Sequence, residues 1–391
     1  MVKHKVAFLI SHPTQYHSPL FRELAKQPEI DLTVYFCSKI GLGEQYDKTY
    51  ERVLKWDTPL LEGYKSIFLK KFLGPLHPQI FGELKKNKYD ALIVHGYNSL
   101  TYWLAFFAAW FTKTPLILKG EADLSKKISY FKRVIKKIIL KSLFKRANAF
   151  LYSYDLNKEF FEFYGAPDEK LFFCPSTVDN NFWQTKREEL RGKKDKIKTE
   201  LGINKDLPTV LFVGQFIKRK RVMDLLEAAD NLKKENTNFN LLIVGDGPEK
   251  ENLTSFIEGR NMKDTLIIGF KNQSELPRLY ASSDIFVLPS ESDPSPKAMQ
   301  EAMNFGLSVI ATNRVGTASV LVEKSGSGYI YPVGDKKELA NKLEILVSNN
   351  PLREEKSKKA EEAIKNWSLE EDIKGIIKAI EYVKQSSKRN H

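Results

Sequence analysis

Two carboxylic acids, Asp293 and Glu301, stand eight positions apart around a polar loop that joins an apolar, strand-like run to a short amphipathic helix. The loop, residues 290–296, is expected at the amino end of that helix, where backbone N–H groups and the helix dipole favour a phosphate. An acid just inside the helix can accept hydrogen bonds from a vicinal diol, as the ribose-binding carboxylate of dinucleotide folds does. A phosphate site beside a diol site indicates a nucleotide or a nucleotide sugar.

A run of basic residues follows an earlier strand in the same half of the chain. The segment GQFIKRKR, residues 214–221, stands between a strand-like run and a helical run. Glycine at a strand end lets a ligand approach the backbone closely. Four consecutive cations at a helix start oppose the helix dipole, so a diphosphate ligand explains them better than stability does. A solvated run of surface charge is the alternative interpretation.

These segments resemble motifs of the retaining glycosyltransferases of family 4, the glycosyl transferases group 1, which have the GT-B fold. The two spaced acids resemble the Glu-x7-Glu signature, and residues 213–220 resemble the VGR…K loop. Residues 245–248 read GDGP, as in the family, where we expect a tight structural turn. The resemblance spans essentially the whole chain and is strongest over residues 209–334.

The chain departs from the family pattern at three positions. Asp293 replaces the first glutamate of the signature, and Gln215 replaces a basic residue directly after the glycine of the VGR…K loop. Ser319 stands where many members carry the glutamate of GG-x-P-E. These changes concern the phosphate grip and the choice of donor sugar, while the second acid of the signature is kept as Glu301.

The resemblance implies that the second half of the chain binds a nucleoside diphosphate sugar. Lys220, with Arg219 nearby, would neutralise the departing diphosphate, Glu301 would hold the ribose, and Asp293 would lie near the donor sugar. Backbone atoms around Phe270 would contact the base. The predicted donor-binding residues are Gly214, Gln215, Arg219, Lys220, Phe270, Asp293, Ser295, Lys297, Ala298 and Glu301, and Lys220 and Asp293 are also predicted to be catalytic.

The first half should receive the acceptor. The loop after its first strand, residues 11–19, carries histidine, glutamine and tyrosine side chains in reach of sugar hydroxyl groups. His95 ends a strand-like run where the family has a histidine that contacts the donor sugar, so it is predicted to be catalytic; a histidine satisfied by neighbouring backbone is the alternative. The predicted acceptor-side residues are His12, Gln15, Tyr16, His17 and Glu121.

No metal or cofactor is expected. His12 and His17 are not joined by a cluster of acids, and no Asp-x-Asp motif stands at a strand end. The resemblance implies that positive side chains replace a divalent ion and that the sugar nucleotide is a substrate.

Strand-like apolar runs alternate with helical runs in both halves, which predicts parallel sheets covered on both faces. The predicted fold is α/β of the GT-B type, with two Rossmann-like, doubly wound domains facing a central cleft. We expect an acceptor-binding domain at residues 1–185, a linker at 186–206, a nucleotide-sugar-binding domain at 207–366 and a helix at 367–391 that packs back across the domains. A polar, lysine-rich connector is expected at 351–359.

The 391 residues carry a formal net charge of +13, which favours an anionic partner such as a nucleotide, an anionic lipid or a nucleic acid. No nucleic-acid-binding motif of the usual kinds is present, so nucleic acid is not expected. Residues 126–146 contain nine Lys or Arg among apolar residues at helical spacing. Such a helix can lie on an anionic membrane surface, or it can pack on the sheet with a basic solvent face.

The longest apolar run, residues 102–111, is too short to span a membrane, and residues 6–10 are too short for a signal-peptide core. We therefore expect a cytoplasmic protein with peripheral attachment to the inner membrane face. Cys37 and Cys174 lie in apolar runs and should be reduced thiols.

The expected function is metal-independent, retaining transfer of a hexose from a nucleoside diphosphate sugar to a glycan or lipid-linked acceptor, in cell-surface polysaccharide or glycolipid synthesis. A GT-B sugar-nucleotide epimerase and a non-catalytic nucleotide-sugar-binding or membrane scaffold protein are the alternatives.

Overall fold

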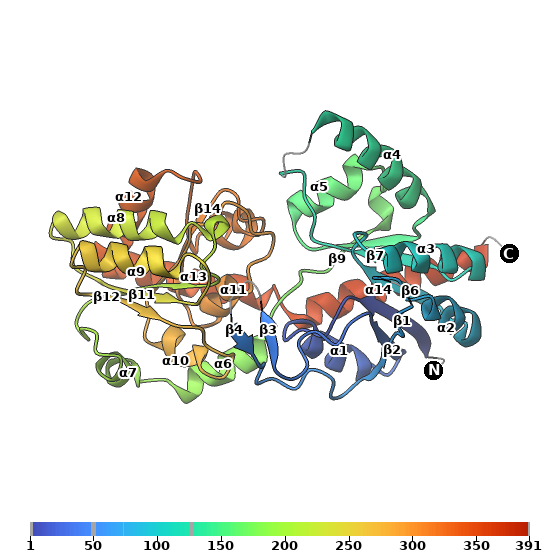
Figure 1. Ribbon diagram of the computed structural model, residues 1–391, viewed down its shortest axis with the longest axis horizontal. Coiled ribbons are helices and arrows are strands. Elements are labelled where there is room, and N and C mark those ends of the chain that lie inside the picture. Colours follow the sequence, from blue (N-terminus) through green and yellow to red (C-terminus); the bar gives the residue numbers. More distant parts are fainter. Residues whose placement is uncertain (1–2, 48–51, 73, 126–128, 390–391) are drawn as a thin grey trace. The chain divides into compact units, whose positions relative to one another are not determined.

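The computed structural model describes residues 3–47, 52–72, 74–125 and 129–389, which form two compact units (Figure 1). Unit 1 consists of residues 1–43, 58–176 and 369–391, and unit 2 consists of residues 44–57 and 177–368. Each unit is built on a parallel sheet with helices on its faces, which confirms the predicted doubly wound α/β architecture.

The sheet of unit 1 has seven strands, and all of its strand pairs are parallel. Helices cover both faces, so strand residues of either parity are buried and the sequence reads as continuous apolar runs. In sheet order the strands are β5 (Lys65–Phe68), β2 (Ile30–Phe36), β1 (His4–Ile10), β6 (Ala91–His95), β7 (Leu116–Lys119), β8 (Ala149–Tyr152) and β9 (Leu171–Phe173).

The helices of unit 1 make two apolar clusters with the sheet, one on each face. On one face lie α2 (Gln79–Asn87), α3 (Leu100–Thr112), α4 (Tyr130–Arg146) and α5 (Asp155–Phe163). On the other face lie α1 (His17–Ala25) and the last helix, α14 (Leu369–Arg389). A short 3-10 turn, η1 (Asp168–Lys170), precedes β9.

Helix α14 is fixed to unit 1 through a buried carboxylate, Asp372. The thiol of Cys174 donates to Asp372 Oδ1 at 2.9 Å, and the backbone N–H of Ser176 donates to the same oxygen at 3.0 Å. The ammonium of Lys119 lies 3.8 Å from this oxygen and 2.9 Å from the Cys174 sulfur. Burial raises the pKa of the Cys174 thiol, which keeps it protonated as a donor, and both Cys174 and Cys37 are free thiols, as predicted.

The sheet of unit 2 has six strands and is also parallel throughout. In sheet order the strands are β12 (Thr265–Ile268), β11 (Asn240–Val244), β10 (Thr209–Val213), β13 (Ile285–Leu288), β14 (Ser308–Thr312) and β15 (Gly328–Tyr331). The chain order reverses between β10 and β13, and the edge formed by the carboxyl ends of the strands at such a point is where ligands bind in doubly wound sheets.

Helices join the strands of unit 2, as the alternating pattern predicts, and two further helices precede the first strand. In chain order the helical segments are α6 (Asn180–Glu189), α7 (Lys194–Glu200), the 3-10 turn η2 (Lys218–Lys220), α8 (Val222–Lys234), α9 (Lys250–Gly259), α10 (Leu276–Ala281), α11 (Lys297–Asn304), the π-helix η3 (Ser319–Lys324), α12 (Lys336–Ser348) and α13 (Asn350–Lys365). A small antiparallel pair, β3 (Gln45–Asp47) and β4 (Arg52–Leu54), also belongs to this unit.

The division between the units differs from the predicted one. The chain passes from unit 1 to unit 2 between Ser176 and Thr177, whereas a linker was expected at residues 186–206. Some of those residues belong to α6 and α7, which are rich in charged residues but each bury an apolar face. Trp183 of α6 is fully buried and meets Tyr280 edge-on with ring centroids 5.7 Å apart.

The lysine-rich stretch at residues 351–359 was predicted to be a connector, but it lies within helix α13. The side chain of Asn349 caps this helix by accepting from the backbone N–H of Leu352 at 3.0 Å, and Pro351 occupies the first turn. Lys356 and Ala360 of this helix are buried, so a polar composition hides a packed face.

Candidate functional site

The loops after β10 and β13 are bonded to each other at the carboxyl edge of the unit 2 sheet. The backbone N–H of Glu291 donates to the Arg219 carbonyl at 2.8 Å, and the Arg219 guanidinium donates to the Ser292 carbonyl. The Lys220 ammonium forms an ion pair with Asp293, in which the two side chains are 12% and 13% exposed. The basic loop and the loop of the two acids therefore meet. Lys220, the predicted phosphate-binding cation, is paired with Asp293, the first acid of the signature.

The loop after β14 holds the same acid from its other side. Asp293 makes an isolated parallel bridge with Val315. Its N–H donates to the Arg314 carbonyl at 3.3 Å, and its carbonyl accepts from the Gly316 N–H at 2.9 Å. Arg314 is exposed beside this bridge and adds a cation that the sequence reasoning did not name. Backbone contacts on both sides thus position Asp293.

Helix α11 begins directly after this loop, and its preceding residue, Pro296, makes no side-chain cap. Ser295 is buried, and its hydroxyl accepts from Gln300 Nε2 at 3.0 Å and from Lys297 Nζ at 3.2 Å. Ala298 follows in the first turn. An anion near this helix start would meet backbone N–H groups, the positive end of the helix and the ammonium of Lys297.

Glu301 lies within α11 and is almost completely buried. Burial raises the pKa of Glu301 to about 7, although the Tyr280 hydroxyl, which donates to Oε2 at 2.7 Å, and the nearby Lys297 ammonium both act to lower it. Tyr280 lies on α10, where its ring is buried and its hydroxyl holds this carboxylate. The predicted ribose-binding acid therefore changes its charge near neutral pH.

The glycines of the GDGP turn have the structural duty that the sequence predicted. A Cβ atom on Gly245 would lie 1.8 Å from the Gly214 carbonyl oxygen, and one on Gly247 would lie 2.8 Å from the Phe216 carbonyl oxygen. The Phe216 N–H donates to the Asp246 carbonyl at 2.8 Å. Close packing of these two turns holds the backbone of Gly214, and with it the start of the basic loop.

Phe270 follows β12 on the same edge of the sheet and is only partly buried. Its ring meets the Trp56 ring edge-on, with centroids 5.9 Å apart. A little further along, the Ser274 N–H donates to Asp57 Oδ2 at 3.1 Å. Trp56 and Asp57 come from the first half of the sequence, and no sequence signal pointed to them. Gln215, directly after Gly214, is partly buried at the end of β10.

In unit 1, His17 and His95 lie side by side at the carboxyl edge of the sheet. His95 ends β6, His17 begins α1, and the strand that leads into α1 pairs with β6. The two rings meet edge-on with centroids 4.9 Å apart, and the Thr14 hydroxyl lies 2.8 Å from His17 Nδ1. The sequence named both histidines but did not predict that they are neighbours.

The other predicted loop residues of unit 1 are close to this pair in sequence. His12 Nδ1 lies 2.9 Å from the Ser11 hydroxyl, and burial lowers the pKa of His12 below its ordinary value. Tyr16 precedes α1 and is partly buried. Gln15 is buried, and within the described part of the chain its Oε1 has no hydrogen-bond partner. A ligand hydroxyl would satisfy such an acceptor.

Glu121, expected on the acceptor side, follows β7 and is bonded within unit 1. The Ser176 hydroxyl donates to its Oε1, and the Tyr154 hydroxyl donates to its backbone carbonyl at 2.8 Å. Tyr154 also donates to Asp123 Oδ2 at 3.2 Å. The carboxylate is therefore held in place by residues of its own unit.

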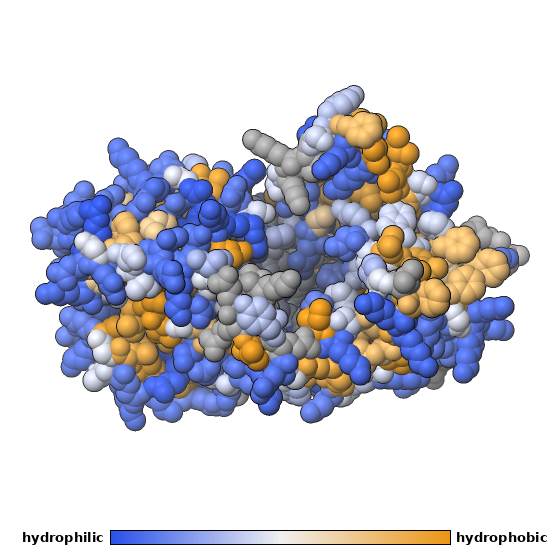
Figure 2. Space-filling view, in the orientation of Figure 1, coloured by the Kyte–Doolittle hydropathy of each residue, from blue (hydrophilic) through white to orange (hydrophobic). Residues whose placement is uncertain are grey.

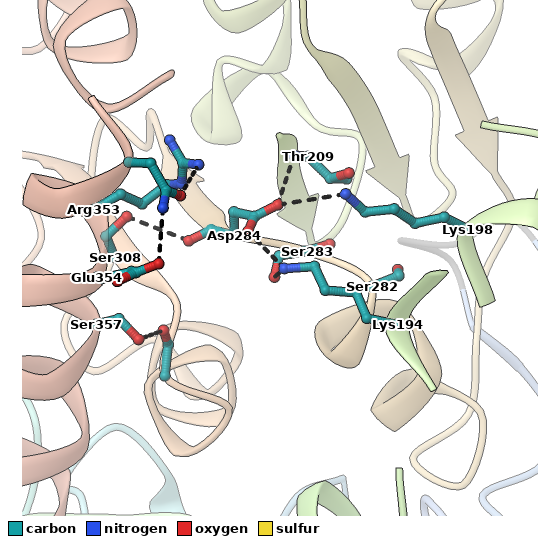
Figure 3. A network of polar contacts seen from close by, with 12 residues as sticks. Lys194, Lys198, Thr209, Ser282, Ser283, Asp284, Ser308, Arg353, Glu354 and Ser357 are labelled. Carbon is teal, nitrogen blue, oxygen red and sulfur yellow. Dashed lines mark hydrogen bonds and ion pairs between the residues drawn. The ribbon is translucent and has the colours of Figure 1, made fainter. Parts of the chain in front are cut away.

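A cavity of about 650 Å³ lies at the opposite, amino edge of the unit 2 sheet. Figure 3 shows the polar network there, in which Asp284 accepts from Lys194 Nζ at 2.6 Å and from the Thr209 N–H at 2.8 Å, with Lys198 3.7 Å away. Burial would raise the pKa of Asp284, but these partners bring it below its ordinary value. Because its charges are paired and it lies away from the carboxyl ends of the strands, we assign this network to stability.

Helix α4 has an outer surface on which apolar and basic side chains mix, as Figure 2 shows. Leu140, Leu143 and Phe144 are buried against unit 1, whereas Phe131 and Ile138 are 73% and 67% exposed. Residues 126–128 of the predicted basic segment lie outside the described residues. No helix within the described ranges is both long enough and apolar enough to cross a membrane.

Residues 193–367 match the family model described as glycosyl transferases group 1. Over 172 residues the chain is 30% identical to an uncharacterized glycosyltransferase of Haemophilus influenzae, and this match covers 43% of the chain and 48% of that protein. The chain spans about half the length of the curated relatives it matches. Residues 193–367, which match the family model, contain the basic loop, both acids and α11.

Similarity to solved structures extends over nearly the whole chain. A glycosyltransferase from Rickettsia africae superposes with a TM-score of 0.75 at 17% identity, covering 97% of this chain and 98% of that one. An Anabaena protein in complex with UDP and glucose superposes with a TM-score of 0.71 at 16% identity, covering 97% and 99%. At such identities the likeness shows the fold, and the chain has the predicted GT-B fold.

Proposed function

We propose that this chain, whose residues 193–367 match the family model of glycosyl transferases group 1, is a retaining glycosyltransferase that moves a hexose from a nucleoside diphosphate sugar to a glycan or lipid-linked acceptor. The observation that carries the proposal is the cluster at the carboxyl edge of unit 2. Lys220 and Arg219 lie there against the loop of Asp293, and Glu301 is buried in the helix that follows.

The cluster suits a diphosphate because two of its cations, Arg219 and Lys220, are held in place by contacts within the protein. The Lys220 ammonium is neutralised by Asp293. A diphosphate carries more negative charge than one carboxylate, so it would compete for Lys220 and draw on Arg219 and Lys297 as well. Positive side chains would then do the work that a divalent ion does elsewhere, and the proposed reaction needs no metal.

The proposed chemistry is a front-face displacement at the anomeric carbon. The bond from this carbon to the diphosphate oxygen breaks, and a bond to the acceptor hydroxyl oxygen forms on the same face. The departing phosphate takes the acceptor proton, so no protein nucleophile is required. Lys220 and Arg219 would stabilise the negative charge that develops on the leaving group, which is electrostatic catalysis. Asp293 would bind the donor sugar.

Unit 1 would supply the acceptor site. His17, His95 and the buried acceptor atom of Gln15 lie at the carboxyl edge of its sheet and offer hydrogen bonds to sugar hydroxyl groups. We propose that the acceptor belongs to cell-surface polysaccharide or glycolipid synthesis, and that the protein works at the inner face of the membrane.

The exposed surface of α4 supports this location. Phe131 and Ile138 offer apolar area, and the Lys and Arg residues between them offer charge, which is the combination that binds anionic lipid interfaces. Binding to phosphatidylglycerol vesicles should be lost in a Phe131→Asp/Ile138→Asp variant. The matched control is Ile345→Asp, which changes a partly exposed apolar residue of α12 in unit 2. Equal binding of both variants would contradict the membrane role.

The test of the function is a nucleotide-binding screen followed by a turnover assay. Thermal stability is measured with UDP, GDP, ADP, CDP and their common sugars, with and without EDTA. A ligand at a hundred times its dissociation constant stabilises the native state by about 2.7 kcal/mol. A shift with one nucleotide that persists in EDTA, and sugar transfer that is lost in Glu301→Ala but kept in Glu344→Gln on α12, are expected. No shift with any nucleotide would favour a scaffold protein, and conversion of the donor without an acceptor would favour an epimerase.

A further inference from the structure

The segment at residues 52–57, called the strap here, comes from the first half of the sequence but belongs to unit 2. It consists of β4 and the three residues that follow it, and Leu54 within it is buried. An excursion of this kind is not needed to complete the six-stranded sheet, whose strands all come from residues after 208. The contacts that the strap makes within unit 2 therefore indicate its role.

The strap is joined to the loop after β12 at two points. The Trp56 ring meets the Phe270 ring edge-on at 5.9 Å, and the carboxylate of Asp57 accepts from the Ser274 N–H at 3.1 Å. Trp56 and Phe270 are each only partly buried, so this pair keeps aromatic surface open to solvent. The hydrogen bond of Asp57 fixes the strap at the far end of the loop.

The loop between these two contacts contains a polar atom with an unmet hydrogen-bonding capacity. Asn272 Oδ1 is buried, and among the described residues it has no hydrogen-bond partner. A buried acceptor without a partner costs free energy, so a ligand with an N–H group would be stabilised there. Open aromatic surface beside an unpaired acceptor matches a nucleobase, which has π-faces and N–H groups on its edge.

The position in the sheet agrees with this ligand. The loops after β10 and β13 form the proposed diphosphate cluster, and β12 lies two strands from β10 on the same carboxyl edge. Neighbouring strands are about 4.8 Å apart, so the β12 loop lies roughly 10 Å from the β10 loop, close to the span of a nucleoside from its phosphate to its base. The ribose would lie between them.

We infer that the strap completes the nucleobase site of the donor unit, with Trp56 as its aromatic wall and Asn272 Oδ1 as an acceptor for a base N–H. The inference rests on the proposed donor site. Asp57 is a positioning residue, since it acts by holding the strap to the loop. Stacking tolerates every base because each has a π-face, so Trp56 supplies affinity and Asn272 supplies selectivity.

The test compares ligands with and without a base on the full-length protein. Titration calorimetry is performed with inorganic pyrophosphate and with whichever of UDP, GDP, ADP or CDP the wild type binds most tightly. Trp56→Ala should weaken binding of the nucleoside diphosphate by roughly 5- to 150-fold, the effect of losing one base–aromatic stack. Trp56→Phe should restore most of the affinity, and pyrophosphate should bind all variants equally.

The control variant is Tyr46→Ala, which removes an exposed aromatic ring from β3 of the same unit and should leave both affinities unchanged. An unchanged nucleoside diphosphate affinity in Trp56→Ala would overturn the inference. A loss that is equal for pyrophosphate, or equal in Tyr46→Ala, would overturn it too, because the effect would then not come from a base on Trp56. Failure of the wild type to bind any nucleoside diphosphate would instead refute the donor site itself.

Discussion

Replacement of Tyr280 by phenylalanine should shift the pH dependence of nucleotide binding. The substitution removes only the hydroxyl that donates to Glu301 Oε2 at 2.7 Å, and it keeps the ring that packs against Trp183 and Phe305. If the ionised Glu301 accepts hydrogen bonds from the ribose, binding of a nucleoside diphosphate should strengthen as the pH rises through its pKa of about 7.

The size of the shift follows from the lost hydrogen bond. A hydrogen bond to a charged group is worth roughly 1.5–3 kcal/mol, and one pKa unit corresponds to about 1.4 kcal/mol. The pKa of Glu301 should therefore rise by roughly 1–2 units in Tyr280→Phe. At pH 7 the ionised fraction, and with it the affinity, should fall by roughly 5- to 50-fold, and the difference should nearly vanish above pH 10.

The assay is titration calorimetry with the tightest-binding nucleoside diphosphate between pH 6 and pH 10. Tyr331→Phe is a matched control, because the Tyr331 hydroxyl on β15 is buried and has no hydrogen-bond partner within the described residues. Superimposable profiles for Tyr280→Phe and the wild type would refute the reasoning, and so would equal shifts in the two variants.

Three further predictions concern single residues. Lys220→Ala should lower turnover by roughly 10²- to 10³-fold in a donor-saturated assay, since it removes a charge from the leaving group, and an unchanged rate would contradict that role. Glu301→Gln should raise the thermal midpoint at pH 8 but hardly at pH 4. Burial raises the pKa of Glu301 from 4.5 to about 7 in the folded protein. The stability that the protonated acid contributes is therefore complete below pH 4.5, and about 3 kcal/mol of it is lost as the pH rises through 7. Equal midpoint changes at both pH values would exclude this linkage. Asp372→Ala should destabilise the protein by about 3–5 kcal/mol in urea unfolding, because it leaves the Lys119 ammonium buried without its acid; a loss below 1 kcal/mol would show that the pair is not needed.

Much of the donor site could be predicted from the sequence because each of its residues stands in a short motif next to a strand. Lys220, Asp293 and Glu301 each follow a strand at a fixed offset, and a parallel sheet brings all such offsets to one edge. Hydrophobic periodicity also predicted a parallel sheet in each half of the chain, and the structure has both. The short strands β3, β4 and β5 were missed, since three or four residues carry too little pattern.

The predictions that differed from the structure concerned charged segments. Residues 186–206 and 351–359 were interpreted as linker and connector because of their composition, yet the first range includes the end of α6 and all of α7, and the second lies within α13. Their few apolar residues are enough to pack when a neighbouring surface is present, and composition alone does not reveal that surface. The packing of helix α14 likewise depends on tertiary contacts. Its buried Asp372 stabilises the fold because Lys119 and Cys174, from distant parts of the sequence, lie beside it.

The sequence by itself determined the class of fold, the alternation of apolar strands with helices, and the residue types at the ends of those strands, because hydrophobic periodicity and turn chemistry are local properties of the chain. Tertiary structure alone decided which of these residues meet. It placed the Lys220 ammonium on Asp293, the Tyr280 hydroxyl on Glu301, and Trp56 on a loop more than 200 residues away in sequence. Contacts between such distant residues depend on strand order and on packing, and no local pattern records them.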